Sequence, residues 1–166
     1  TCFFAYFRTI YPLYYFPLYS MAERSLLLLK PDVIHRSLVG TIIARIEARN
    51  FKIIALKMFD PKRETLDEHY AHIVSKPFYP EIVNYMTMGP VVGIIVEGKN
   101  VVAGMRQLCG ATNPAEAEMG TLRADYSNDI GANIIHASDS IENAETEIVR
   151  FFNAEDICSY ERKIIG

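Results

Sequence analysis

The stretch "NIIHASDSIENAETEIVRFF" (residues 133–152) joins a short apolar run to a segment in which apolar residues recur with helical spacing. The run at 133–138 predicts a buried strand, and the spacing after it predicts an amphipathic helix. His136 lies near the end of that strand, just before the start of the helix. Backbone N–H groups at a helix N-terminus favour anions, so we expect a site to form around His136.

The start and the buried face of this last helix also follow from the pattern. Asp139 and Glu142 have the D-x-x-E spacing of a capping box, which predicts that the helix begins between them. Four apolar side chains recur every three or four positions and are expected to face the core: Ile141, Ala144, Ile148 and Phe151.

Upstream of residue 133, short apolar runs alternate with segments of helical periodicity. Further strands are predicted at 25–30, 51–59 and 91–98, the last between Gly89-Pro90 and Gly98. Helices are predicted over 36–49 (stopped by Asn50), 65–74, 80–87 and about 100–108. The order β-α-β-(αα)-β-α-β-α is typical of a ferredoxin-like α/β sandwich, a four-stranded antiparallel sheet covered by helices.

Residues 110–131, "GATNPAEAEMGTLRADYSNDIG", form a long polar segment between the helix at 100–108 and the histidine strand. A loop of this length inside a compact domain is usually functional or disordered. The sequence therefore predicts that this loop contributes to the site around His136.

Composition bounds the remaining possibilities. The 166 residues suffice for one domain, half are apolar, 22% are charged, and the net charge of −3 gives no general reason to bind nucleic acid or a membrane. The three cysteines show neither disulfide nor metal-site spacing, which favours a reducing cytoplasm. Residues 1–20 are rich in Phe and Tyr but interrupted by prolines, so we interpret them as an extension outside a domain at 21–166, rather than a membrane helix or signal peptide. The alternative is a hydrophobic anchor or partner-binding arm.

The residues predicted to lie near His136 suit phosphoryl transfer. That reaction needs positive groups around a charge-rich transition state and an aligned nucleophile, and a neutral histidine can be the nucleophile if a partner holds its other nitrogen. Glu147, on the helix that follows, is a candidate for that partner. Basic and polar candidates for phosphate contacts bracket the histidine, although each alone could be a solvated surface residue: Lys30, Arg106, Thr112, Arg123 and Asn133.

Several other chemistries lack their motifs. The chain has no GxxxxGK[ST] phosphate loop, no GxGxxG fingerprint and no GxSxG elbow. His69 and His72 are spaced like a metal pair, but no third ligand lies nearby in the sequence. A ferredoxin-like RNA-binding module is disfavoured because the predicted central strands are aliphatic and the net charge is negative.

The segment "NIIHASDS" resembles the signature of nucleoside diphosphate kinases, Asn-x-x-His followed by Gly or Ala and Ser-Asp. The resemblance runs from about Met21 to Phe152 and includes "LLLLKPD", "EHYAHIVSKPFYPEIVNYMTMGPVV", "VEGKNVV" and "RQLCGATNPAEAEMGTLRADY". It implies a phosphotransferase that moves the terminal phosphoryl group of a nucleoside triphosphate, mainly ATP, to nucleoside diphosphates. The implied cycle is ping-pong through a pros-phosphohistidine on His136, with Mg²⁺ carried on the nucleotide and no metal held directly by the protein.

The resemblance also implies roles for individual residues. Glu147 and Ser138 would orient the imidazole, with Tyr70 in support. Lys30 and Asn133 would contact the sugar, Lys30 also the phosphate side, and Phe78 would stack on any base. The phosphates would be held by Arg106, Thr112 and Arg123.

Departures from the family pattern leave some features open. Val33 replaces the usual glycine after "KPD", and a β-branched residue resists positive φ, so we expect a slightly different turn. Ala137 is an accepted variant of glycine after the histidine. The short tail "CSYERKIIG" leaves the oligomer open between hexamer, favoured by the loop with Pro114, and tetramer. A regulatory or binding protein on the same scaffold is the alternative function.

Overall fold

A computed structural model describes residues 22–162; the extension predicted at 1–20 lies outside this range. Four strands form one antiparallel sheet in the order β2-β3-β1-β4: β1 (Glu23–Leu29), β2 (Lys52–Phe59), β3 (Val91–Gly98) and β4 (Ile135–Ala137). This order and the covering helices confirm the predicted ferredoxin-like α/β sandwich.

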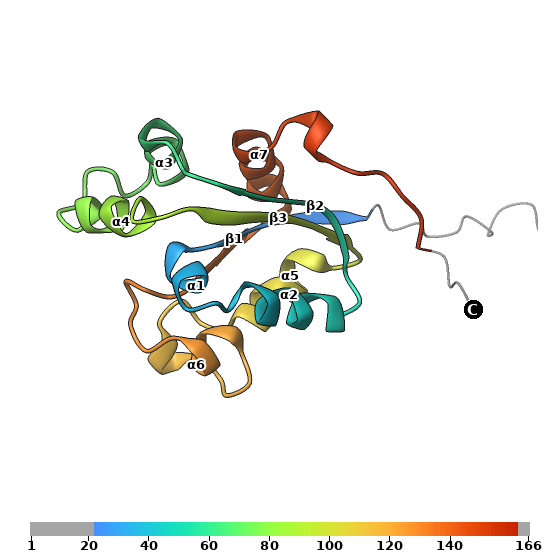
Figure 1. The fold of residues 1–166 in the computed structure, drawn as a ribbon, viewed down its shortest axis with the longest axis horizontal. Helices are drawn as coiled ribbons and strands as arrows, with labels where there is room; N and C mark the ends of the chain where they lie inside the picture. Colours follow the sequence, from blue (N-terminus) through green and yellow to red (C-terminus); the bar gives the residue numbers. More distant parts are fainter. Residues whose placement is uncertain (1–21, 163–166) are drawn as a thin grey trace, which may run out of the picture.

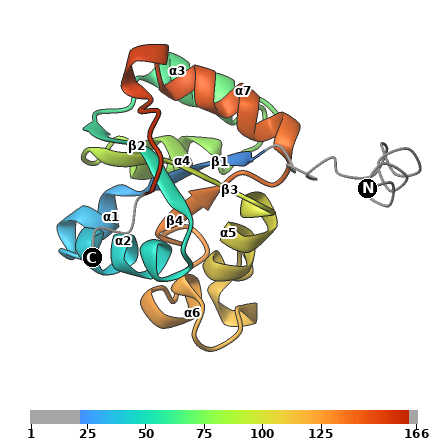
Figure 2. The ribbon, with the colours of Figure 1, turned by 90° about the vertical axis from the view of Figure 1, so that its right-hand side faces the viewer.

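Helices cover both faces of the sheet (Figures 1 and 2). One face carries α1 (Pro31–His35), α2 (Val39–Ala48), α5 (Val101–Cys109) and α6 (Leu122–Tyr126), and the other carries α3 (Arg63–His69) and α7 (Ile141–Phe151). The helix α4 (Tyr79–Met86) follows α3 at one end of the sheet. Two short 3₁₀ helices complete the set, η1 (Pro114–Glu116) and η2 (Ala154–Asp156).

The run of four leucines in β1 is explained by this double cover. Successive side chains of a strand point to opposite faces. Leu27 and Leu29 pack in the core beneath α2 and α5, whereas Leu26 and Leu28 pack in the core beneath α7, and all four are fully buried. Buried on both sides, the strand therefore reads as a continuous apolar run rather than an alternating one.

The last helix begins differently from the prediction. Its N-cap is Ser140, whose hydroxyl accepts a 3.1 Å hydrogen bond from the backbone N–H of Asn143. Asp139 instead accepts from the side chain of Asn143, so the predicted D-x-x-E capping box was wrong. Ile141 was also wrongly assigned to the core, since at the first helical position its side chain is 44% exposed.

Other boundaries shifted for local reasons. The helix predicted at 36–49 begins later, as α2 at Val39, because Ser37 has a left-handed conformation. The short helix α1 precedes this segment and was not predicted, and Asn50 at φ 60° follows the end of α2 as expected. The long loop at 110–131 contains η1 and α6, because Asn113 and Thr121 each cap a short helix through their side chains. Val33 lies in α1 and is fully buried, and its φ is not positive, so no left-handed turn is needed where glycine was expected.

Within residues 22–162, no helix combines the length and the apolar character that crossing a bilayer requires.

Candidate active site

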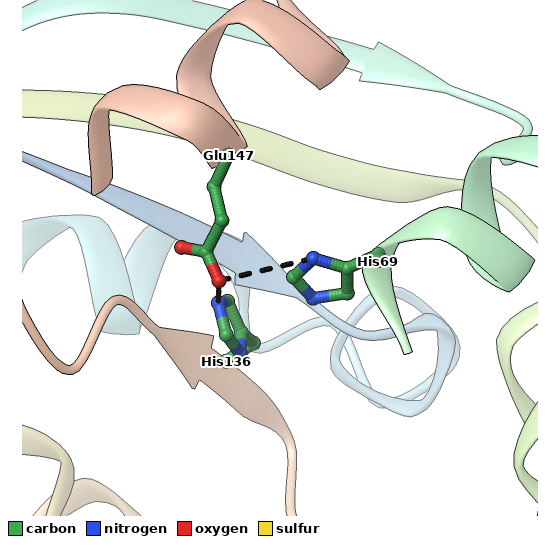
Figure 3. A group of neighbouring side chains, drawn as sticks. All are labelled: His69, His136 and Glu147. Carbon is green, nitrogen blue, oxygen red and sulfur yellow. Dashed lines mark ion pairs between the residues drawn. The ribbon is translucent and has the colours of Figure 1, made fainter. Parts of the chain in front are cut away.

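His136 lies on β4 directly opposite Leu28 of β1. Residues opposite each other on neighbouring strands share a face of the sheet, and Leu28 faces α7. The imidazole therefore points to the face where α7 and the end of α3 meet, as Figure 3 shows. The sheet register, rather than a flexible loop, thus sets the position of the histidine.

Glu147 of α7 holds one nitrogen of that histidine. Its Oε1 lies 2.9 Å from His136 Nε2, and its Oε2 accepts a 2.6 Å hydrogen bond from the Ser138 hydroxyl (Figure 3 draws the first contact). The Ser138 oxygen in turn accepts a 3.0 Å bond from the backbone N–H of Leu26. The carboxylate is therefore fixed at both oxygens, and its support is fixed by β1.

These contacts favour an ionised Glu147 and one tautomer of the neutral His136 ring. Burial opposes ionisation of Glu147, but the bonds from His136 and Ser138 outweigh it and hold the pKa of that carboxyl below its ordinary value. A carboxylate beside Nε2 requires the imidazole proton to be on Nε2, because two acceptors would repel each other. The lone pair of a neutral His136 is then on Nδ1.

His69, at the end of α3, is a member of this group that sequence reasoning did not place near His136. Its Nδ1 lies 3.8 Å from Glu147 Oε1, and its ring meets that of His136 edge-on with centroids 4.5 Å apart. Burial, and then the neighbouring His136, lower the pKa of His69 to about 3, so it is neutral. The His-Tyr pair at 69–70, at the end of an amphipathic helix, gave no signal that distinguished it from a core histidine.

A cavity of about 600 Å³ opens beside His136, a size typical of small-molecule sites. It brings together eight of the ten residues predicted from the sequence: Lys30, Tyr70, Arg106, Thr112, Arg123, Asn133, His136 and Glu147. Ser138 is not part of the lining because it is buried beneath it. Phe78 is also outside the lining; it precedes α4 and its side chain is 48% exposed.

Lys30 and Asn133 are linked across the cavity floor. The ammonium of Lys30 donates to Asn133 Oδ1, and the amide nitrogen of Asn133 donates a 3.0 Å bond to the carbonyl of Thr112. Burial, and then the positive charge of Arg123, lower the pKa of Lys30 to about 8, although Asp32 acts in the opposite direction. An anion bound beside Lys30 would therefore stabilise its charged ammonium form.

Arg123 ties the long loop to the histidine strand. Its guanidinium donates 2.6 Å bonds to the carbonyls of Gly110 and Ile135 and a longer one to that of Asn133. Gly110 has φ 80°, and a Cβ there would collide with the Thr121 side chain, so glycine is required. Three of the five N–H donors of Arg123 are used in this way, which leaves two for a ligand.

The backbone just before the histidine is strained. Ile134 has φ 58°, and the N–H of Ile135 donates a 2.7 Å bond to the carbonyl of Asn133, which closes a γ-turn. Such a conformation is an outlier for a β-branched residue. The Ile134 carbonyl accepts a 2.8 Å bond from the N–H of Lys30, so the turn brings Lys30, Asn133 and the histidine strand together.

Tyr70 and Arg150 also line the cavity. Burial, and then the charge of Glu147, raise the pKa of Tyr70 to about 12, so its phenol remains a hydrogen-bond donor. Arg150, one turn after Glu147 on α7, also lines the cavity and lies 3.7 Å from Glu68. Sequence reasoning missed Arg150, although its i+3 spacing from Glu147 places both on one side of the helix.

The arrangement matches an anionic ligand that reacts at His136. A neutral imidazole presents one free nitrogen, and the cavity offers cationic side chains from four different elements or loops: Lys30, Arg106, Arg123 and Arg150. Charge that develops on phosphoryl oxygens would be stabilised by such preorganised donors.

Comparison with known proteins gives a consistent answer. The family model described as Nucleoside diphosphate kinase matches residues 23–157. The chain is 49% identical over 139 residues to the nucleoside diphosphate kinase of Methanothermobacter thermautotrophicus (84% of this chain, 93% of the relative). It is 47% identical over 138 residues to that of Drosophila melanogaster (83% and 90%).

Solved structures agree. The structure of a halophilic nucleoside diphosphate kinase from Halobacterium salinarum in complex with CDP superposes with a TM-score of 0.82 at 38% identity, covering 85% of this chain and 94% of that one. The apo enzyme of Encephalitozoon cuniculi gives 0.80 at 42% identity, covering 83% and 94%. Sequence, fold and comparisons together establish that the chain belongs to the nucleoside diphosphate kinase family, a family of phosphotransferases.

Proposed function

We propose that this nucleoside diphosphate kinase transfers the terminal phosphoryl group of a nucleoside triphosphate, mainly ATP, to nucleoside diphosphates through a covalent phosphohistidine on His136. The observation that carries the proposal is the contact of Nε2 with Glu147, which directs the lone pair of the ring to Nδ1. A nucleophile held in one tautomer by an orienting carboxylate is the usual arrangement for histidine catalysis.

In the first half-reaction, Nδ1 attacks the γ-phosphorus. The new N–P bond forms as the bond to the bridging oxygen breaks, and the diphosphate leaves with that electron pair. The ring becomes cationic while it carries both the phosphoryl group and the Nε2 proton, and the ionised Glu147 stabilises this charge. Ser138 keeps the carboxylate in place through its 2.6 Å bond.

In the second half-reaction, an oxygen of a bound diphosphate attacks the same phosphorus. The N–P bond breaks and its electrons return to Nδ1, which restores the neutral imidazole. No proton has to leave the site in either step, since Nε2 stays protonated throughout. One cavity is therefore enough for donor and acceptor in turn.

Nucleotide binding follows from the residues around the cavity. Arg106 and Thr112 are exposed at its wall and are proposed to contact phosphates, together with the two unused N–H groups of Arg123. Lys30 and Asn133, already linked to each other, are proposed to contact the sugar hydroxyls, and Lys30 also the phosphates. The half-exposed ring of Phe78 is proposed to stack on the base, a contact that every base can make.

Enzymes of this family typically use a divalent metal, and we propose Mg²⁺ carried by the nucleotide. The donor set fits this choice: besides Glu147, which is engaged with His136 and Ser138, the lining offers only Glu68 and Asp139 as carboxylates. Mg²⁺ is usually bound through one or two carboxylates, waters and substrate phosphates. Carried by the nucleotide phosphates in this way, it would neutralise phosphate charge.

Intact-mass measurement tests the mechanism. After brief incubation with ATP and Mg²⁺, the chain should gain one acid-labile phosphoryl group, and a chase with GDP should remove it and form GTP. The His136→Ala variant should gain none, while His72→Ala, which removes another histidine of the cavity, should behave as the wild type. Phosphorylation that persists in His136→Ala would overturn the assignment.

We also propose a homo-oligomer, with a hexamer favoured over a tetramer, acting in the cytoplasm. Support for self-association comes from β2, an edge strand on which Leu56 and Met58 are 51% and 57% exposed. Support for a reducing compartment comes from Cys109 and Cys158, which are free thiols. Sedimentation velocity distinguishes the oligomers; a monomer at micromolar concentration would contradict the first proposal.

A further inference from the structure

The side chains of three potential metal ligands, all of which line the cavity, point toward one another (Figure 3). His69, His136 and Glu147 each offer one ligand atom, and these atoms all lie within 4.8 Å of one another. Glu147 Oε1 faces Nδ1 of His69 and Nε2 of His136. Phosphoryl transfer as proposed above makes no use of His69. Its side chain is only 2% exposed, and Nδ1 has no hydrogen-bond partner among the described residues. A buried polar atom that is left unsatisfied in this way calls for an explanation.

The distances are close to those of a zinc site. In tetrahedral zinc sites with bonds of about 2.0–2.1 Å, ligand atoms are about 3.3 Å apart. The observed separations from Glu147 Oε1 are 2.9 Å to His136 and 3.8 Å to His69, and the three ligand atoms all lie within 4.8 Å of one another, so the side chains would have to move closer together to bind an ion. Two histidines and a glutamate form a known set of three zinc ligands that keeps a fourth position open.

The surroundings also favour such an ion. Imidazole nitrogens select zinc and similar transition ions over Mg²⁺, which prefers oxygen. Ser138 donates to Oε2 of Glu147, so Oε1 is the oxygen that faces the two histidines, and metal sites use this kind of outer support. All three ligand residues line the cavity, which gives an ion and its water a path from solvent.

We propose that His69, His136 and Glu147 form a binding site for Zn²⁺ or a similar divalent transition ion, and that its occupation switches the enzyme off. Occupation would inhibit transfer because a neutral imidazole carries one proton, on one of its two nitrogens. An ion on Nε2 takes the lone pair there, so the proton must be on Nδ1. Nδ1 can then no longer attack phosphorus. The inhibition rests on the proposed function, whereas the binding does not.

Calorimetric titration of ZnCl₂ into the nucleotide-free chain tests the binding. The wild type should bind one ion per chain at this site. His69→Gln should weaken that binding by at least about tenfold, the smaller loss that removal of even a supporting partner causes. His72→Gln, three residues away and also in the cavity wall, is the matched control and should bind as the wild type. Equal affinity in folded His69→Gln would overturn the site.

X-ray absorption on the zinc-loaded wild type keeps the test valid if His69→Gln does not fold. The spectrum should show nitrogen and oxygen ligands with scattering from two imidazoles. A shell that contains sulfur or fewer than two imidazoles would place the ion elsewhere and overturn the proposal.

Phosphoryl incorporation at buffered free zinc tests the inhibition. The wild type should lose phosphorylation as the site fills. With each rate expressed as a fraction of the same protein's zinc-free rate, His69→Gln should need at least about ten times more zinc for the same fractional loss. Full phosphorylation of a zinc-loaded wild type would overturn the inhibition. A zinc-free wild type that never becomes phosphorylated would instead overturn the proposed function, and the titration would still decide the site.

Discussion

The hydroxyl of Ser138 donates to one oxygen of Glu147 while His136 contacts the other, so one carboxylate joins the end of β4 to the second turn of α7. Glu147 thus holds His136 in place directly, and Ser138 does so through Glu147. The charge of Glu147 and the position of its carboxylate can therefore be tested separately, by substituting Glu147 and Ser138 in turn.

Glu147→Gln keeps the size of the side chain but removes its charge. We expect kcat to fall roughly 10²–10³-fold, since a preorganised charge that stabilises the phosphorylated ring is lost. Ser138→Ala should reduce kcat less but lower stability by about 1–3 kcal/mol, because the buried N–H of Leu26 loses its acceptor. Steady-state kinetics and thermal unfolding measure both. An unchanged kcat in Glu147→Gln would contradict the orienting role.

Phe78→Ala should weaken nucleotide binding to a similar extent for all bases. Loss of a stacking contact costs roughly 1–3 kcal/mol per base, so KM should rise at least about fivefold for ADP, GDP, CDP and TDP alike. Val74→Ala, also exposed between α3 and α4, is the control and should leave KM unchanged. A loss confined to purines or to pyrimidines would argue against general stacking.

The lowered pKa of Lys30 predicts a pH dependence. With a pKa of about 8 instead of 10.5, the ammonium is charged below pH 8 and becomes neutral above it. Affinity for phosphate should therefore fall as pH rises past 8, and kcat/KM should fall by up to about tenfold per pH unit. Lys30→Arg keeps its charge and should give a flat profile at a lower level. A wild-type profile that is flat from pH 7 to 10 would contradict the prediction.

The cap of α7 can be tested by a pair of neighbouring substitutions. Ser140→Ala should lower the free energy of unfolding by about 1 kcal/mol, because the N–H of Asn143 loses its acceptor. Asp139→Ala removes only a bond between two exposed side chains and should change it by less than about 0.5 kcal/mol. Urea denaturation of both variants gives the comparison. The reverse ranking would restore the capping box that the sequence suggested.

The sequence predicted elements well where the signals are local. The strand at 91–98 has its predicted bounds, because Gly89-Pro90 precedes an uninterrupted apolar run. The strand predicted at 133–138 is shorter, Ile135–Ala137, because Ile134 adopts a positive φ. Nothing in the composition indicates this conformation, so the sequence could not predict the shorter strand.

The spacing of residues along the chain did not predict the contacts between distant segments. Arg123 was expected to hold phosphates, yet three of its five N–H groups donate to the carbonyls of Gly110, Asn133 and Ile135. His69 had spacing to His72 that suggested a metal pair, but its neighbours in space are His136 and Glu147. Such pairings depend on how α3 and α7 pack over the sheet, which neither helix encodes alone.

The γ-turn at Ile134 has one more consequence. Its conformation is unfavourable for an isolated chain and persists because β1, Asn133 and the surrounding core impose it. A synthetic peptide of residues 133–147 would relax to ordinary extended backbone and lose the alignment of His136 with Glu147. The chemistry of this histidine is therefore not a transplantable motif, and a short graft of "NIIHASDS" onto another scaffold should be inert unless the supporting strand comes with it.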